Sequence, residues 1–305
     1  MKGPALIEKQ HGDLRYLQFS QYLKFPHIRH GIFTRLGGYS PSPYQGLNTA
    51  TPPRGWAAGD SVDNVVRNRA LALQALDISD YPCVTLWAVH GADSVVLDIR
   101  DEWRSDWACH SYYEKSWTPA SIRKGDALIT NERGVAITLS FADCTPITLY
   151  DPVREVIGVV HGGWRGTARG IALAAVETMV ERFDCQPQSI HAGIAPTIGT
   201  CCYEISENVQ QLFLGQEEFE DIPTREQYRD IVRESAVFST RQLPDRKSLR
   251  LDLQATNCNQ LLMAGLRPEH IEVMEICTSC NTDKFFSHRG EQGKTGRFPV
   301  IMALA

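Results

Sequence analysis

Residues 141–166, FADCTPITLYDPVREVIGVVHGGWRG, contain two apolar runs, 146–150 and 156–160, separated by a short polar segment. Short apolar runs rich in β-branched residues predict buried strands. Cys144 comes just before the first run and His161 directly follows the second. In sheets flanked by helices, ligands gather where strands end, so these two side chains are either ordinary core residues or parts of one site.

Similar β-rich runs recur along the chain and alternate with patterns of helical periodicity. Besides the two runs above, strands are predicted at 14–19, 30–34, 83–89, 95–98, 126–130, 135–140, 190–195, 271–276 and 299–304, and helices at 62–77, 166–183, 205–213 and 251–266. Several strands follow one another without a helix, which favours an α+β (mixed α/β) fold over a purely parallel sheet. No repeat or linker divides the chain, so we expect one domain over 1–305, with the polar, tryptophan-rich stretch 100–124 as a surface insertion.

The composition is that of an ordinary globular protein of 305 residues, 43% of them hydrophobic. The net charge of −5 comes from 31 basic and 36 acidic residues that are well mixed, so we expect a small-molecule substrate and no nucleic-acid partner. Neither a signal-like N-terminus nor a run of about 18 apolar residues is present, which predicts a cytoplasmic protein without membrane association. The nine cysteines are odd in number and scattered, which favours reduced thiols.

Three strand ends carry a cysteine or histidine: His90 in LWAVHGAD, Cys144 in FADCTP and His161 in GVVHGGWRG. Two imidazoles and a thiolate are three protein ligands for tetrahedral zinc, with the fourth position left open as in catalytic sites. The soft thiolate disfavours magnesium and calcium but would also accept copper. Taken singly, each residue is more often structural, Cys144 as a small buried hydrophobe and each histidine as a satisfied strand-end residue.

Other residues could serve such a site. Asp143 could orient a ligand imidazole, or simply form the turn before Thr145. Glycines and arginines after His161, Arg165 among them, could hold a phosphate at a helix start. Arg35 and Asn48 lie in a glycine- and aromatic-rich loop at 33–50, and Arg297 in a second glycine-punctuated loop near the C-terminus, although both loops could be ordinary connections. Cys277 and Cys280 form CTSC, half of a zinc knuckle or a redox pair, for which a structural or incidental role is favoured because no second CxxC follows.

With these motifs in view, the sequence resembles the polyphenol oxidase or laccase-domain family, of purine nucleoside phosphorylase type, which includes the bacterial peptidoglycan editing factor. The motifs that carry the resemblance are HGIFTRLGGYS, GLN at 46–48, VHG at 89–91, DALIT, FADCTPI, VVHGGWRG, AGIAPTIGTCCYEIS, DLQATNCNQLLMAGL and FFSHRGEQGKTGR. The resemblance implies a layered α/β/β/α sandwich, and it places the family's metal ligands on His90, Cys144 and His161. A longer stretch between His90 and Cys144 departs from the family pattern.

The resemblance implies a zinc enzyme that cleaves adenosine, inosine and methylthioadenosine with inorganic phosphate and also deaminates adenosine. In that reaction Cys144, His161 and His90 are the catalytic residues, and Arg35, Asn48, Arg165 and Arg297 are candidates for binding substrate. The alternatives are a metal-free cysteine hydrolase using Cys144 and His161, a peptidoglycan-precursor editing factor and a copper-dependent phenol oxidase. We expect a monomer or a homodimer.

Overall fold

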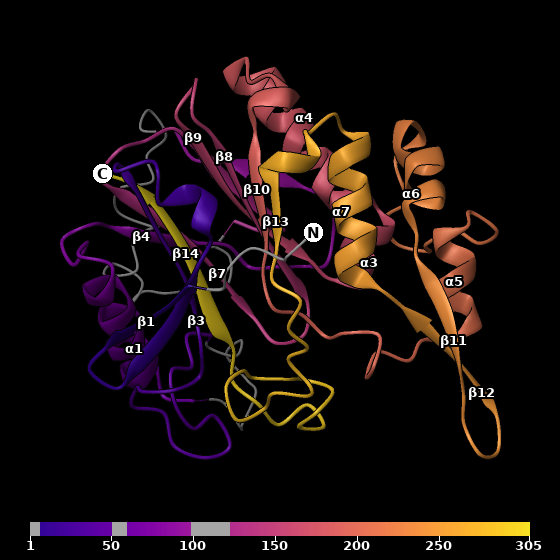
Figure 1. Cartoon of the computed structure of the whole chain (residues 1–305), viewed down its shortest axis with the longest axis horizontal. Helices are drawn as coiled ribbons and strands as arrows, with labels where there is room; N and C mark the ends of the chain where they lie inside the picture. The colour runs from indigo at the N-terminus through magenta and orange to yellow at the C-terminus, as the bar shows by residue number, and fades with distance from the viewer. Residues whose placement is uncertain (1–6, 51–59, 99–122) are drawn as a thin grey trace.

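The computed structural model describes residues 7–50, 60–98 and 123–305, which build two six-stranded sheets with helices on their outer faces (Figure 1). The first sheet has the order β1 (Ile7–His11), β2 (Leu14–Gln18), β3 (Ile28–Phe33), β14 (Phe298–Leu304), β7 (Val135–Phe141) and β4 (Cys83–Thr85). The second has the order β13 (Ile271–Val273), β10 (His191–Ile194), β8 (Thr145–Asp151), β9 (Val156–Gly162), β6 (Ala127–Thr130) and β5 (Ser94–Val96). Both sheets mix parallel and antiparallel pairs, so the predicted mixed fold is confirmed.

The hydrophobic core forms three layers that explain the arrangement of helices. Side chains such as Leu139, Phe298 and Val159 fill the space between the two sheets, and each is at most 2% exposed. A second buried cluster lies on the outer face of the first sheet and includes Leu73 of α1 (Val62–Ala75). A third buried cluster lies on the outer face of the second sheet and includes Val176 of α4 (Ile171–Phe183) and residues of α7 (Leu253–Met263). Burying one such side chain stabilises the fold by about 1.5–3 kcal/mol. The layers therefore follow the α/β/β/α order that the resemblance implied.

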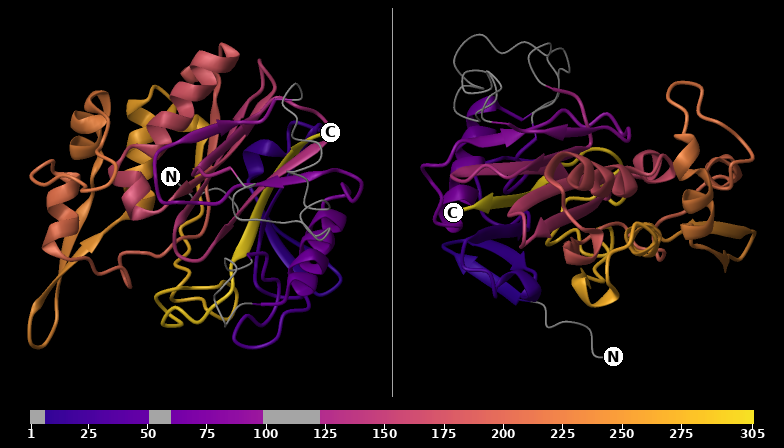
Figure 2. Two further views of the ribbon diagram at one scale, coloured as in Figure 1. Left: turned by 180° about the vertical axis from the view of Figure 1, so that it is seen from behind. Right: turned by 90° about the horizontal axis from the view of Figure 1, so that it is seen from above.

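A smaller group of elements stands at one end of the second sheet (Figure 2). It consists of α3 (Trp164–Ala168), α5 (Glu207–Phe213), α6 (Arg229–Ser235) and the hairpin β11 (Phe238–Gln242) and β12 (Lys247–Leu251). These elements share a fourth apolar cluster with the start of α7. The group continues from α3, directly after the glycine turn that follows His161.

Two crossings between the sheets position the residues of interest. The chain leaves β4 of the first sheet and enters β5 of the second through residues 86–93, and it leaves β7 and enters β8 through 142–144. Asp143 has a left-handed backbone (φ 82°) and turns the second crossing. Because β8 pairs antiparallel with β9, placing Pro146 opposite His161, both crossings meet the end of β9.

The structure corrects several element boundaries. The helix predicted at 166–183 is two helices, because Gly170 adopts a left-handed conformation (φ 80°) where a Cβ would lie 2.8 Å from the Tyr228 ring. The strand predicted at 83–89 ends at Thr85. Strands β1 and β11 were not predicted, since their largely exposed, polar residues give no apolar run. Helix α6 and strand β12 were also missed.

Other sequence expectations bear on residues that the structure does not cover. Nearly all of the expected insertion at 100–124 lies outside the described residues, together with Cys109 and His110.

The eight cysteines that are described form no disulfide. Among the described segments, no helix has the length and apolar character that crossing a membrane requires.

Candidate metal centre

His90, Cys144 and His161 converge at the end of β9. Their ligand atoms, two imidazole nitrogens and one sulfur, all lie within 4.8 Å of one another. In a tetrahedral zinc site, bonds of about 2.0–2.3 Å place neighbouring ligand atoms roughly 3.5 Å apart. The three side chains therefore fit a metal with only small adjustments. His161 is 5% exposed whereas His90 is exposed, so the group opens to solvent on the His90 side.

A buried carboxylate, Asp126, organises the two histidines. Its Oδ1 lies 2.9 Å from His161 Nδ1, which leaves the other nitrogen of that imidazole for a metal. The same carboxylate accepts the backbone N–H groups of Val89, His90 and Gly91 at 3.2, 3.0 and 2.7 Å. Asp126 thus fixes one ligand through its ring and the other through its backbone, as carboxylates beside metal-bound histidines do. Sequence reasoning missed this role, although Asp126 opens the DALIT motif.

Gly163 provides the space in which the three ligands meet. A Cβ at this position would lie 3.0 Å from Cys144 Sγ, 3.1 Å from His90 Cδ2 and 3.6 Å from His161 Cε1. Any larger residue would therefore press on all three side chains. Glycine at this position, the second after His161, therefore keeps bulk away from the three side chains.

The electrostatics of the group favour a thiolate. Burial alone would raise the pKa of the Cys144 thiol, but His161 and then His90 outweigh burial and lower that pKa to about 6. For His161 burial alone would lower the pKa, but the Cys144 thiolate and the Asp126 carboxylate outweigh burial and raise that pKa to about 10. Without a metal, the pair is thus a thiolate beside an imidazolium, and the same thiolate is the form that binds metal.

His90 has an unusual backbone that its neighbours hold in place. Its φ of 61° lies in the left-handed region, which a non-glycine residue adopts only when its surroundings require it. Its carbonyl accepts a hydrogen bond from Arg169 at 2.7 Å, and Arg169 also contacts Asp221 at 2.6 Å. Arg169 is buried and fully engaged, so it supports His90 and is not available for a phosphate.

Asp143 is tied to two loops. Its Oδ1 accepts the hydroxyl of Thr278 and its Oδ2 accepts the backbone N–H of Arg289, each at 2.6 Å. The imidazole-orienting contact that the sequence suggested for Asp143 is made by Asp126. Asp143 instead holds the turn that presents Cys144.

Three of the four candidate substrate residues lie together, on loops around the start of β14. The Arg35 guanidinium bonds Glu291 and the Thr282 carbonyl, each at 2.8 Å. Asn48 is buried, and its Oδ1 accepts the backbone N–H of Arg297 at 2.9 Å. The adjacent Phe298 packs on Phe141, whose ring centre is 5.5 Å from that of His161. Arg35 and Asn48 therefore brace loops, whereas the side chain of Arg297 is exposed.

The fourth candidate, Arg165, lies closer to the ligands. It is exposed, two residues after Gly163, and its guanidinium stacks on Trp164. Tyr203 is a further neighbour, and the Arg289 guanidinium lies 5.3 Å from its ring centre. Burial raises the pKa of its phenol, and Cys144 raises it further, while Arg289 and Arg165 act in the opposite sense. The phenol of Tyr203 thus stays protonated and is influenced electrostatically by the thiol and by both arginines. Tyr203 was missed, although it belongs to the quoted CCYEIS motif.

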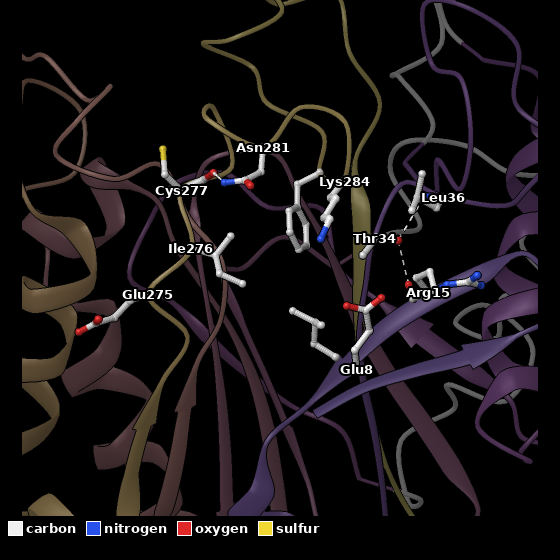
Figure 3. A pocket seen from close by; sticks show the side chains of 11 residues that line it. Glu8, Arg15, Thr34, Leu36, Glu275, Ile276, Cys277, Asn281 and Lys284 are labelled. Atoms are coloured by element: carbon white, nitrogen blue, oxygen red, sulfur yellow. Dashed lines mark hydrogen bonds between the residues drawn. The ribbon is translucent and has the colours of Figure 1, made fainter. Parts of the chain in front are cut away.

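Cys277 and Cys280 do not join this group. They lie with Cys201 and Cys202 in a separate cluster. A cavity of about 270 Å³ lies beside that second region, lined by Glu8, Arg15, Thr34, Cys277, Lys284 and others (Figure 3). None of the three ligands lines it, so the cavity is distinct from the candidate metal centre.

Comparisons with known proteins agree with this architecture. The chain is 35% identical over 269 residues to a Geobacillus stearothermophilus protein named purine nucleoside phosphorylase YlmD, covering 88% of this chain and 86% of that protein. It is 29% identical over 274 residues to the protein of that name from Bacillus subtilis, covering 90% and 87%. The crystal structure of YlmD from Geobacillus stearothermophilus superposes with a TM-score of 0.75 at 31% identity, over 98% of this chain and 99% of that one.

A family model described as "Multi-copper polyphenol oxidoreductase laccase" matches residues 29–305. Together with the similarity to YlmD over most of both chains, this match shows that the protein belongs to the laccase-domain family.

Proposed function

We propose that this protein is a zinc-dependent purine nucleoside phosphorylase that acts on adenosine, inosine and methylthioadenosine, with adenosine deamination as a second activity. The observation that carries the proposal is the convergence of His90, Cys144 and His161 around Gly163, with Asp126 behind them. Relatives named purine nucleoside phosphorylases supply the reaction class.

In phosphorolysis, a phosphate oxygen attacks C1′ of the ribose while the bond from C1′ to the purine nitrogen breaks. The electron pair of that bond leaves with the purine, which takes up a proton. Arg165, exposed beside the group, suits the phosphate, because guanidinium binds phosphate oxygens through charge-assisted hydrogen bonds. The protonated phenol of Tyr203 can donate a hydrogen bond to the substrate but not accept its proton. Arg297 is a second candidate for the phosphate.

His90, Cys144 and His161 would hold the zinc ion. When bound, zinc supplies a Lewis acid and lowers the pKa of bound water toward neutrality, which suits stabilisation of developing charge as well as deamination. Asp126 keeps the His161 imidazole in the tautomer whose free nitrogen faces the group. Gly163 and Phe141 limit the space around the three side chains, and the site stays open to solvent on the His90 side.

Copper chemistry is the function that the family description names. The His₂Cys set would accept copper as well as zinc. A multicopper oxidase, however, needs several histidine-rich centres, and within 7–50, 60–98 and 123–305 only one group of possible ligands contains histidine. Phenol oxidation with added copper would therefore be a secondary property of this site.

A metal-free cysteine hydrolase is a second candidate, favoured by one observation. The lowered pKa of Cys144 beside a raised pKa of His161 describes an activated nucleophile with its base. A hydrolase of this kind needs only one imidazole beside the sulfur, but here two imidazoles face it, and Asp126 holds His90 through the backbone. Three metal ligands explain this arrangement better.

The test is to incubate zinc-loaded protein with adenosine, inosine or methylthioadenosine, with and without inorganic phosphate. The base is measured together with the sugar phosphate, which is ribose 1-phosphate from adenosine and inosine and 5-methylthioribose 1-phosphate from methylthioadenosine. We expect phosphate-dependent release of base by the wild type and by Cys258→Ala, whose cysteine lies outside both clusters, and none by Cys144→Ala. Phosphate-independent release that persists after chelation would support the hydrolase. Equal rates for wild type and Cys144→Ala would overturn the catalytic assignment and leave an editing or binding role.

A further inference from the structure

Four cysteines from two distant segments meet in a second cluster. Cys201 and Cys202 follow β10, and Cys277 and Cys280 follow β13. All four sulfurs lie within 4.8 Å of one another, and Cys280 Sγ is 3.4 Å from the sulfurs of both Cys201 and Cys202. The two pairs are separated by about 75 residues along the chain, and Cys201 and Cys280 are exposed. Packing of a hydrophobic core therefore does not explain why the four sulfurs meet.

The spacing of the sulfurs fits one tetrahedral ion. Zinc–sulfur bonds of about 2.3 Å place the sulfurs of a tetrathiolate site roughly 3.8 Å apart. A disulfide would require about 2.05 Å, and adjacent cysteines such as Cys201 and Cys202 have α-carbons too close for an unstrained bond. In two-iron and four-iron clusters the thiolates bind different irons and are held further apart by the inorganic core.

The backbone around the cluster is shaped for sulfur ligands. Gly199 donates its N–H to Cys277 Sγ at 3.2 Å, the type of hydrogen bond that stabilises metal-bound thiolates. A Cβ on Gly199 would lie 3.2 Å from Cys277 Cβ and 3.4 Å from Cys201 Sγ, so glycine leaves room for them. Asn281 closes the CTSC turn by donating to the Cys277 carbonyl at 2.8 Å (Figure 3).

Positive charge adjoins the cluster. Four thiolates around a divalent ion carry a net charge of −2, which nearby cations stabilise. Arg241 and Arg250 reach the Cys201 carbonyl at 3.4 and 3.5 Å. Arg250 is only 7% exposed, and its buried Nε has no hydrogen-bond partner in the structure. Its Nη2 lies 3.9 Å from Glu204 Oε2, so this carboxylate and the cluster lie on either side of the buried guanidinium charge.

The cluster also joins two loops that contact Asp143: the loop after β10, whose Ile198 N–H bonds the Asp143 carbonyl at 3.1 Å, and the loop after β13. The Thr197 N–H bonds the Ile276 carbonyl at 3.2 Å and the Thr278 N–H bonds the Thr197 carbonyl at 3.0 Å, so the two loops already run side by side. Thr278 then bonds Asp143 at 2.6 Å, next to Cys144. A metal ion bound by the four cysteines would link these two loops a second time.

We propose that Cys201, Cys202, Cys277 and Cys280 form a second, structural metal site that binds one zinc ion as a closed tetrathiolate and fastens the loop after β10 to the loop after β13. The site is independent of the proposed catalytic activity. Its four protein ligands leave no open position for substrate, which is the arrangement of structural zinc sites. Its role is to hold the turn that presents Cys144.

Metal counting on the full-length protein tests the proposal. After purification under reducing conditions with zinc present, we expect two zinc ions per chain in the wild type and in Cys258→Ser. We expect one in Cys144→Ala and one in the Cys277→Ser/Cys280→Ser double variant. Equal zinc content in wild type and double variant would overturn the proposal, as would iron in this site or disulfides among the four cysteines of the reduced protein.

The Cys144→Ala variant keeps the test decisive if the double variant does not fold. It should retain one metal ion, and cobalt substituted there should show the intense sulfur-to-metal charge transfer of a tetrathiolate. Bound metal should also protect four thiols from alkylation, which mass mapping identifies. A Cys144→Ala protein without bound metal, or with these four cysteines alkylated as fast as after chelation, would contradict the site whatever the activity of the wild type.

Discussion

The protein contains two clusters of potential metal ligands that differ in every feature that matters for chemistry. The group of His90, Cys144 and His161 offers three mixed ligands where two sheets meet, and it is open on one side. The cluster of Cys201, Cys202, Cys277 and Cys280 offers four identical ligands on two loops at the surface. Three protein ligands with an open coordination position are typical of catalytic zinc sites, and four protein ligands with no open position are typical of structural zinc sites.

The two clusters also differ in how their thiols are tuned. Histidines lower the pKa of Cys144, whereas hydrogen bonds with Cys201, then Cys202 and Cys277, raise the pKa of Cys280. Asp126 stabilises the first group with a buried charge, and the second has backbone N–H groups and arginines. Although burial would raise the pKa of Cys277, hydrogen bonds from the backbone of Gly199 and Cys280 lower it. The clusters therefore differ in which groups tune their thiols: imidazoles act on Cys144, and backbone amides and other thiols act on the four cysteines.

Among the variants considered, Asp126→Asn is expected to reduce metal affinity at the His90, Cys144 and His161 group the most. The amide replaces one acceptor oxygen with a donor, so contacts to His161 or to the 89–91 backbone are lost. Removing such a partner lowers metal affinity or activity about 10–100-fold. Zinc titration with a competing chelator measures the loss, with Asp143→Asn as a comparison. If Asp143→Asn costs more affinity than Asp126→Asn, the assignment of the orienting carboxylate is reversed.

The next difference concerns alkylation of the metal-free protein. The thiolate is the nucleophile, so the rate at a cysteine rises as the pH rises through its pKa. Cys144 should reach half its maximal rate near pH 6, because its pKa is lowered to about 6, whereas Cys280 should still be mostly protonated at pH 8. Mass mapping after timed iodoacetamide treatment separates the two. Faster labelling of Cys280 than of Cys144 at pH 7 would contradict the described electrostatics.

Much of this contrast could be predicted from the sequence, and the reasons differ by residue. His90, Cys144 and His161 follow apolar runs, and such runs are the strongest local signal of strands, so their convergence at strand ends was foreseeable. Asp126 and Tyr203 lack such a signal, since their roles depend on which strands pair and which loops touch. The cysteine cluster escaped for the same reason: CTSC finds its partners in CC, 75 residues earlier, and no fixed spacing links them. Strands β1 and β11 are polar and exposed, and tertiary pairing alone makes them strands.

A smaller effect is expected from Gly163→Ala. The added methyl would lie about 3 Å from Cys144 and His90, so the ligands must shift, and overpacking of this kind costs typically about 1–3 kcal/mol. Gly158→Ala is the control in β9, the strand that precedes Gly163, because its Cβ would make only ordinary contacts of 3.4 Å or more. Zinc affinity should fall for Gly163→Ala and stay unchanged for Gly158→Ala. Equal affinities would show that Gly163 does not shape the group.

The smallest effect should come from Thr278→Val, which cuts the link between the two clusters. The lost hydroxyl leaves the Asp143 carboxylate with one partner fewer, at a cost of about 1–3 kcal/mol in the free energy of unfolding. Thr138→Val loses a buried hydroxyl bond to the Val300 carbonyl within the first sheet, and neither residue belongs to a cluster. Both variants should be less stable to urea, but only Thr278→Val should weaken metal binding. The same metal affinity in both would mean that the clusters are uncoupled.

The most direct measurement compares Cys144→Ala with Cys280→Ser in one assay of phosphate-dependent purine release and one thermal melt. The account predicts that Cys144→Ala loses at least about 100-fold in activity, since removing a ligand should cost no less than removing its carboxylate partner, while its melting temperature changes little. It predicts that Cys280→Ser melts at a lower temperature but keeps most of its activity per folded molecule. Full activity in Cys144→Ala, or complete loss of activity in a normally folded Cys280→Ser, would contradict the division of the protein into a reactive and a structural metal site.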